Sequence, residues 1–237
     1  MTKLRTTFIW ITLFSIAMGY MESAVVVYLR ELFYPEGFTF PLQPIDGLVA
    51  VTEILREAAT IIMLIGIGVV AGKTNIERFA WFIYCFAVWD IFYYIFLKVL
   101  IGWPESFLTW DILFLIPVTW VGPVIAPILV SLTMILLALV IVKPERVYGV
   151  KTKVYKLDWM LFILGSLIII GSFTEEYTRF ILNSYSLKVI WSLPNHKPLF
   201  DLAYTYEPEI YRWWIFWIGE LIILFGIGRI YFRNWRR

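Results

Sequence analysis

Ionisable side chains recur inside the long apolar runs of this 237-residue chain. A charge near the centre of a membrane-crossing helix costs about 2.5–3.5 kcal/mol, so each one needs a partner, water or a neutral form. We expect seven of them to form one polar cluster, and these candidates are Glu22, Arg56, Glu57, Asp90, Glu176, Arg179 and Glu220. Such a cluster could exchange protons, bind a small charged solute, or hold the headgroup of a lipid-linked substrate.

Helical periodicity places several candidates on polar faces. A stripe of small and polar residues in the first apolar run spans an arc of about 80°; it comprises Thr12, Ser15, Gly19 and Glu22. In the second apolar run, polar residues recur at helical spacing and so share one face of the helix; these are Glu53, Arg56, Glu57 and Thr60. Each face must pack against protein or line a cavity, because lipid offers no polar partner.

Asp90 and Glu220 are the carboxyls nearest the middle of their runs. Asp90 is followed at i+4 and i+8 by Tyr94 and Lys98, which share its side of the helix. Glu220 has aromatic neighbours such as Trp213 at helical spacing, a setting that favours a protonated carboxyl. The structural alternative is that these groups only form interhelical ion pairs and hydrogen bonds that fix the packing.

The composition excludes a water-soluble globule. Hydrophobic residues make up 61% of the chain and charged residues 16%, and the mean hydropathy is +0.79. Apolar runs of roughly twenty residues predict an all-α polytopic membrane protein with six transmembrane helices in a single domain, residues 1–237. The expected spans are about Phe8–Tyr28, Val49–Ala71, Ala80–Ile101, Val124–Val142, Leu157–Phe173 and Ile210–Tyr231.

The scarcity of cysteine and histidine limits the chemistry. A single Cys85 and a single His196 exclude an internal disulfide framework, a Cys/His zinc site and a haem held by two histidines of this chain. The carboxylate candidates are mixed with arginines, which favours a hydrated, ion-paired network over a closed Ca²⁺ or Mg²⁺ cage. We therefore expect no metal, no cofactor and no nucleic-acid partner.

The charges are sorted by membrane side. An even number of spans puts both termini on one side, and that side collects thirteen of the twenty Lys and Arg residues. Only three of the eighteen acidic residues accompany them, namely Glu77, Glu145 and Asp158. The positive-inside rule then predicts a plasma-membrane protein with both termini in the cytoplasm, with Lys151 inside and His196 outside.

The segment before the fourth span is rich in Trp and Pro. The stretch from Ile112 to Val142 has 31 residues and no charge, which is too long for one upright helix. The pair Gly122-Pro123 predicts a break, because proline lacks a backbone donor and clashes with the preceding turn. Residues from Trp103 to Gly122 are therefore expected to form an interfacial anchor or a re-entrant lid over a polar cavity.

Three classes of function fit these patterns. The leading interpretation is an accessory subunit of a larger membrane complex, based on the 19% aromatic content and the lack of a recognisable motif. One alternative is a proton- or cation-coupled transporter, based on Asp90 and Glu220 on separate helices. Another is an intramembrane enzyme that acts on a lipid or lipid-linked substrate at the outer leaflet. The expected partners are the lipid bilayer and other membrane subunits.

Overall fold

The computed structural model describes residues 2–45, 47–115, 118–149, 151–184, 202 and 204–235. Its elements in chain order are α1 (Thr2–Phe33), α2 (Gly47–Ala71), α3 (Asn75–Ile101), β1 (Trp110–Phe114), β2 (Trp120–Pro123), α4 (Ile125–Tyr148), α5 (Lys156–Leu182) and α8 (Trp213–Trp235). Six of these helices are long and apolar enough to cross a membrane, so the prediction of a multi-pass helical membrane protein is confirmed.

The helices are longer than the apolar runs that predicted them. Helix α1 extends beyond the expected span at both ends, and α5 continues nine residues past Phe173 to Leu182. The added turns of α5 contain Glu175 and Arg179, an oppositely charged pair at i, i+4. Such a pair stabilises a helix where it is no longer surrounded by apolar groups. Hydropathy marks the part of a helix that can lie in lipid, and it misses polar turns that continue the same helix.

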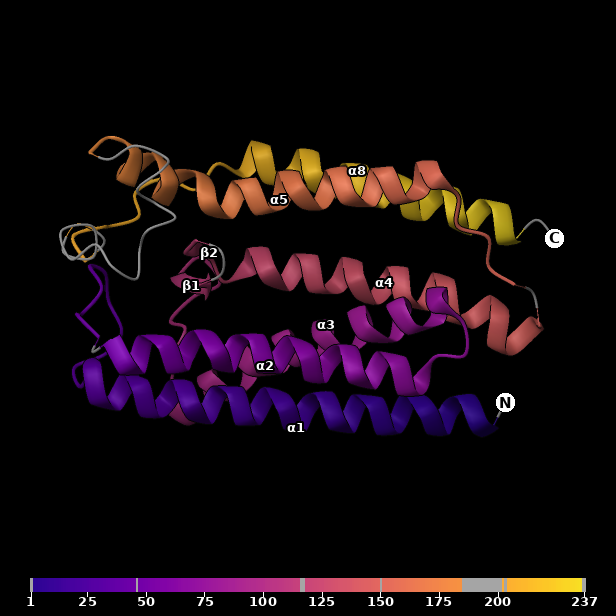
Figure 1. Cartoon of the computed structure of the whole chain (residues 1–237), viewed down its shortest axis with the longest axis horizontal. Helices are drawn as coiled ribbons and strands as arrows, with labels where there is room; N and C mark the ends of the chain where they lie inside the picture. Colours follow the sequence, from indigo (N-terminus) through magenta and orange to yellow (C-terminus); the bar gives the residue numbers. More distant parts are fainter. Residues whose placement is uncertain are drawn as a thin grey trace.

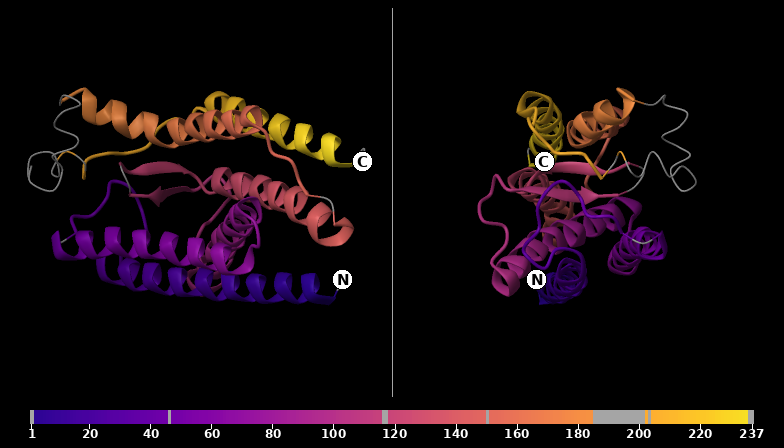
Figure 2. Two further views of the ribbon diagram at one scale, coloured as in Figure 1. Left: turned by 45° about the vertical axis from the view of Figure 1, so that its right-hand side comes forward. Right: turned by 90° about the vertical axis from the view of Figure 1, so that its left-hand side faces the viewer.

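The six helices form two groups, and most of them run along the long axis of the molecule, whereas α3 crosses it obliquely (Figures 1 and 2). In the first, which we call the four-helix group, α3 packs against α1, α2 and α4. In the second, the α5–α8 pair, the two helices pack closely against each other. Helix α4 also contacts α8, and this contact joins the two groups. The beginning of α1 and the end of α8 lie at one end of the bundle, the termini end (Figures 1 and 2).

Close helix contacts are made at glycines. A Cβ atom added to Gly165 of α5 would lie 2.8 Å from the carbonyl oxygen of Gly219 in α8, and one added to Gly219 would lie 2.7 Å from that of Gly165. On the other side of the molecule, a Cβ at Gly19 of α1 would lie 2.9 Å from the carbonyl oxygen of Trp89 in α3. Small residues allow helix backbones to approach in a membrane, where van der Waals packing replaces the hydrophobic effect. The polar stripe expected on α1 is therefore a packing face at Gly19.

Part of the Trp- and Pro-rich segment forms an antiparallel hairpin of β1 and β2. Trp110 pairs with Pro123 and Ile112 with Val121. The hairpin lies toward the end of the bundle opposite the termini, the hairpin end, between the two groups (Figures 1 and 2). Trp120 of β2 stacks on Phe173 of α5 with ring centroids 6.2 Å apart. Strand pairing satisfies backbone groups that neither lipid nor an apolar core could satisfy.

The break at Gly122-Pro123 and the start of the fourth span near Val124 agree with the sequence analysis, since α4 begins at Ile125. The strands themselves were not expected. Tryptophan and proline in this segment indicate the membrane interface as readily as an edge of a sheet, so composition could not distinguish the two. The depth of the hairpin in a bilayer remains a prediction.

Candidate functional site

Most buried charges are neutralised by arginines. At the termini end, the carboxylate of Asp158 in α5 accepts hydrogen bonds from Arg229 (3.1 Å) and Arg233 (2.7 Å) of α8. Glu77 at the start of α3 forms an ion pair with Arg146 near the end of α4. Both carboxylates are fully buried and both link two helices. Sequence reasoning placed these residues on the basic side of the membrane and did not identify them as partners.

Another ion pair joins α1 and α2 toward the hairpin end. Arg56 of α2 contacts Glu22 of α1 and also Glu53, one turn earlier on its own helix. Next to it, one carboxylate oxygen of Glu57 accepts a hydrogen bond of 3.1 Å from the backbone N–H of Leu115, just after β1. The structure therefore brings Glu22, Arg56 and Glu57 together, as the sequence analysis expected, and ties them to the hairpin.

The candidates on α5 bind the segment that leads into α8. Glu176 accepts hydrogen bonds from the backbone N–H groups of Glu209 (2.8 Å) and Ile210 (3.2 Å), and from the hydroxyl of Tyr206 (3.3 Å). Burial, together with the negative charge of Glu176, raises the pKa of Tyr206 well above its ordinary value, so this hydroxyl stays protonated.

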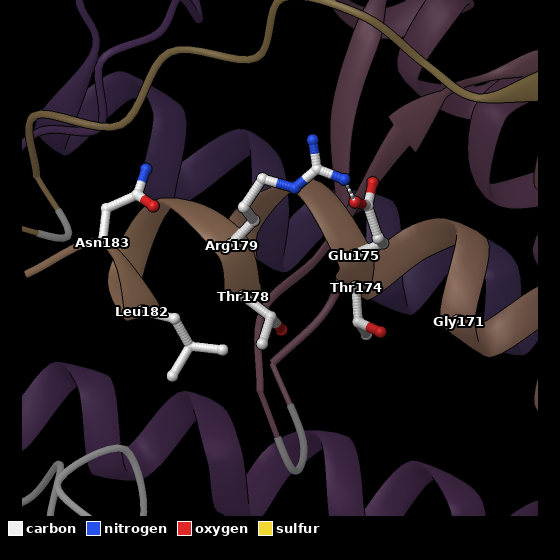
Figure 3. A pocket seen from close by; sticks show the side chains of 7 residues that line it. All are labelled: Gly171, Thr174, Glu175, Thr178, Arg179, Leu182 and Asn183. Atoms are coloured by element: carbon white, nitrogen blue, oxygen red, sulfur yellow. Dashed lines mark hydrogen bonds and ion pairs between the residues drawn. The ribbon is translucent and has the colours of Figure 1, made fainter. Parts of the chain in front are cut away.

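Arg179 forms an ion pair with Glu175, which also accepts from Arg212 at 3.2 Å. Figure 3 shows Arg179 and Glu175 on one side of a shallow pocket of about 450 Å³ along α5. Thr174 and Thr178 also line this pocket. The ion pair is partly exposed, which makes it a weak contributor to stability.

The most enclosed ion pair was missed by the sequence analysis. Arg30 near the end of α1 contacts Asp111 of β1, with 3.3 Å between Nη2 and Oδ1, and the hydroxyl of Tyr94 donates to Oδ2 at 3.2 Å. Arg30 is 8% exposed and Asp111 2%. The guanidinium carbon lies 3.7 Å from the ring centroid of Trp103 and 4.6 Å from that of Phe38. Two aromatic faces therefore replace part of the water around this cation.

The contacts with Arg30 and Tyr94 only partly offset the cost of removing the Asp111 carboxylate from water. Burial raises the pKa of its carboxyl to about 6, while Arg30 and the Tyr94 hydroxyl act in the opposite direction. Arg30 and Asp111 are 81 positions apart, and no periodic pattern links them. The one available signal was that Asp111 is the last charge before a long uncharged stretch.

Asp90 and Glu220 lie on opposite sides of α4. The hydroxyl of Ser131 donates to Oδ2 of Asp90 in α3 at 2.9 Å, and the hydroxyl of Thr133 donates to Oε2 of Glu220 in α8 at 3.0 Å. Glu220 is 2% exposed, and its other oxygen, Oε1, has no hydrogen-bond partner in the described part of the chain. Neither carboxyl forms an ion pair with a described Lys or Arg.

The two hydroxyl contacts differ in what they connect. Ser131 and Asp90 both belong to the four-helix group, whereas Thr133 and Glu220 connect that group to the α5–α8 pair. The bond between Thr133 and Glu220 is thus a direct side-chain link between membrane-crossing helices of the two groups. Glu220 therefore sits where a change of protonation would act directly on the contact between the two groups.

The seven candidates thus occupy several places in the molecule. Glu22, Arg56 and Glu57 lie together at α1 and α2. Asp90 and Glu220 flank α4. Glu176 and Arg179 lie near the end of α5. Within the described residues, no hydrogen bond or ion pair joins one of these places to another, and no set of His, Cys, Asp and Glu side chains could hold a metal ion. His196 lies outside the described residues.

Comparison with protein-family models, curated proteins and solved structures gave no match.

Proposed function

We propose that this protein is a proton- or cation-coupled membrane transporter, and that Glu220 is the group that exchanges the proton. The observation that carries the proposal is the setting of Glu220: a nearly inaccessible carboxyl at the contact between two helical groups, with one oxygen free of partners among the described residues. A carboxyl in such a setting is costly to keep for packing alone, because a neutral side chain would hydrogen-bond to Thr133 at less cost.

The contrast with the other acidic residues supports this role. Asp158, Glu77, Asp111 and Glu22 each face an arginine, which fixes them as ionised structural groups or opposes their protonation. Glu220 and Asp90 face a single hydroxyl each. A proton is the smallest ligand that can neutralise an enclosed carboxylate, and it needs no cavity of its own.

The position of Glu220 also suggests how protonation could produce movement. An ionised Glu220 needs the Thr133 hydroxyl as a donor, whereas a protonated one carries its own donor and depends less on that contact. The contact between α4 and α8 would therefore tighten or loosen with the charge on Glu220. Rocking of one helical group against another is a common way for transporters to open alternately to the two sides.

The orientation belongs to the same proposal. The described acids at the termini end are already paired with arginines, so the remaining lysines and arginines give this end its positive charge. The positive-inside rule favours the cytoplasm for such an end, in the plasma membrane of the cell. The hairpin would then lie on the outer side, between the helices, as an interfacial or re-entrant segment.

An accessory subunit of a larger membrane complex is the second candidate. It is favoured by α2, which packs mainly on α3 and leaves large apolar side chains such as Leu55 and Val70 exposed along the bundle. A partner helix could cover this face as well as lipid does. The intramembrane enzyme considered from sequence gains no comparable support from the described contacts.

Infrared difference spectroscopy of the purified protein in liposomes tests proton exchange directly. In an Asp111→Asn background, which removes the other carboxyl expected to titrate near pH 6, a change of buffer pH should produce a signal from the C=O stretch of a protonated carboxyl, and Glu220→Gln should remove most of it. Glu175→Gln is the matched control, since Glu175 is paired with arginines and partly exposed. A spectrum that Glu220→Gln leaves unchanged would rule out this role. Recovery of a fixed partner in mild detergent, with no carboxyl signal, would instead favour the accessory subunit.

A further inference from the structure

The connection between α4 and α5 presents lysines outward on a segment that is fixed from behind. Its residues alternate in exposure: Thr152 is buried and Val154 half-buried, while Lys151, Lys153 and Tyr155 are exposed. Alternation of this kind is typical of an extended chain with one face on protein. The lysines therefore lie on the face that points away from the bundle.

Three contacts hold the inner face of this connection in place. The hydroxyl of Thr152 donates to the carbonyl oxygen of Ile141 in α4 at 2.9 Å. The backbone N–H of Lys153 donates to Asn234 of α8 at 3.3 Å, and its carbonyl oxygen accepts from Arg233 at 2.9 Å. Because the backbone is bound to two helices, its side chains are presented with little loss of chain entropy on binding.

The acidic residue nearest to this segment is already neutralised. Asp158, in the first turn of α5, is fully buried and holds both Arg229 and Arg233. No described carboxylate forms an ion pair with Lys151, Lys153 or Lys156. The segment thus keeps three exposed ammonium groups at the point where α5 begins.

The neighbouring apolar side chains place the segment at the boundary of the hydrocarbon. Tyr155 is 49% exposed, and Leu157 and Met160, which follow on α5, are also exposed. A tyrosine beside lysines and directly before exposed apolar residues matches the order of a membrane interface, with charge outside and hydrocarbon inside. Lysines at this level face lipid phosphates, and each contributes about fivefold to the binding of an acidic lipid.

We propose that Lys151, Lys153 and Lys156 form a binding site for the phosphate headgroups of acidic phospholipids at the termini end of the protein. The site anchors the α4–α5 connection, which is the covalent link between the four-helix group and the α5–α8 pair. This inference does not depend on proton exchange by Glu220.

Native mass spectrometry of the full chain, released from micelles that contain phosphatidylglycerol or phosphatidylcholine, tests the proposal. The triple variant K151Q/K153Q/K156Q should lose at least about tenfold in affinity for phosphatidylglycerol and should bind phosphatidylcholine as the wild type does. The variant K151R/K153R/K156R, which keeps the charges, should retain the binding. Both variants should melt normally in neutral lipid, since these side chains are exposed.

The control variant K188Q/K197Q removes positive charge from the segment that the sequence assigns to the other side of the membrane. It should bind phosphatidylglycerol like the wild type. An equal loss in this control would show a general effect of net charge and overturn the site. Unchanged binding by the glutamine triple variant would overturn it as well, and so would inorganic phosphate that competes as effectively as the lipid.

Discussion

The carboxylate of Asp111 is buried, and one guanidinium and one hydroxyl take the place of the water that would otherwise solvate it. The groups that face it are Arg30 from α1 and Tyr94 from α3, and Asp90 is near enough to repel it electrostatically. Burial outweighs these partners, since the pKa of Asp111 lies above its ordinary value. The protonation state of this residue should therefore depend on pH in a mildly acidic range.

The first prediction concerns Asp111→Asn. The folded protein holds a proton on Asp111 up to about pH 6, and the unfolded chain releases it near 3.8, so the carboxyl destabilises the fold as the pH rises between these values. Asparagine does not titrate. The stability of the wild type relative to the variant should thus fall by roughly 3 kcal/mol over this interval. Melting in detergent at a series of pH values measures it, and a difference that is constant with pH would contradict the prediction.

The second prediction concerns Arg30→Met, which keeps an unbranched side chain against Trp103 and removes the charge. Without Arg30 the pKa of Asp111 should rise further, so the loss of stability should grow as the pH increases above about 6, toward about 3–5 kcal/mol where Asp111 would have to ionise without a cation. Below that pH a protonated Asp111 needs no counter-ion and the loss should be smaller. The same melting series measures both regimes, and the double variant with Asp111→Asn should recover most of the loss at high pH. An equal loss at every pH would assign the effect to packing instead.

At the scale of the elements, the α5–α8 pair depends on contact between two glycines. A Cβ at Gly165 would lie 2.5 Å from Cγ1 of Ile223 and 2.8 Å from the carbonyl oxygen of Gly219, which is part of the backbone and cannot move aside. The α5–α8 contact is thus set by close backbone approach, with the ion pairs of Asp158 at one end of it.

The third prediction is that Gly165→Ala separates α5 from α8 and destabilises the protein by about 1–3 kcal/mol. Gly171→Ala is the matched control on the same helix, because nothing lies within 4 Å of a Cβ added there. Alanine favours helix over glycine by about 1 kcal/mol, so the control should be neutral or stabilising. Thermal melting in one detergent compares the two. A control as damaged as Gly165→Ala would show that the backbone contact is not the cause.

The elements also show how far sequence reasoning reaches. Hydropathy located all six helices, because the cost of burying a polar backbone in lipid leaves a long apolar helix as the natural solution. It found Asp90 and Glu220 for the same reason, since a charge stands out in an apolar run. It could not find their partners: Ser131 and Thr133 are ordinary residues of α4, and only the packing of α3 and α8 on either side of that helix gives them a role.

The hairpin shows a second limit. Its strands are five and four residues long and are separated by only five residues, but neither shows the alternation of polar and apolar residues that marks a strand in a sequence. The contact between Leu115 and Glu57, and that between Arg30 and Asp111, belong to the same tertiary arrangement. Local patterns predict elements whose period is visible along the chain, and they say little about which distant residues those elements bring together.

At the scale of the whole molecule, the two helical groups meet mainly at the packing of α4 on α8, beside the hairpin, where Thr133 donates a hydrogen bond to Glu220. Each group is fixed within itself at the termini end, by Glu77 and Arg146 in one and by Asp158 and its two arginines in the other. Between the groups, α4 packs against α8 with mostly aliphatic side chains, and aromatic contacts such as Phe79 of α3 on Trp159 of α5 add to this packing. Two helical groups with a largely apolar contact can slide or rock with little loss of hydrogen bonding, which is the kind of movement that the proposed transport would need.

The fourth prediction concerns Thr133→Val, which keeps the shape of the side chain and removes the donor to Glu220. Glu220 would then lack the hydrogen bond that the Thr133 hydroxyl donates. The C=O stretch of the protonated Glu220 carboxyl should therefore change in frequency or amplitude relative to the wild type. Ser131→Ala, which acts on Asp90 in the same way, is the comparison, and it should leave the Glu220 signal in place. A Thr133→Val spectrum identical to that of the wild type would show that the hydrogen bond from Thr133 does not affect Glu220.

The last prediction concerns the orientation of the protein in the membrane, on which the direction of the proposed transport depends. Six spans with both ends at one end of the bundle require the α4–α5 connection to share the side of the termini, and the excess of Lys and Arg there favours the cytoplasm. In a Cys85→Ser background, Lys151→Cys should resist an impermeant thiol reagent on intact cells, whereas His196→Cys should react with it. Both should react once the cells are opened, which controls for buried thiols. Labelling of Lys151→Cys from outside would reverse the orientation, and Glu220 would then lie nearer the cytoplasm, where a proton gradient would drive it in the opposite sense.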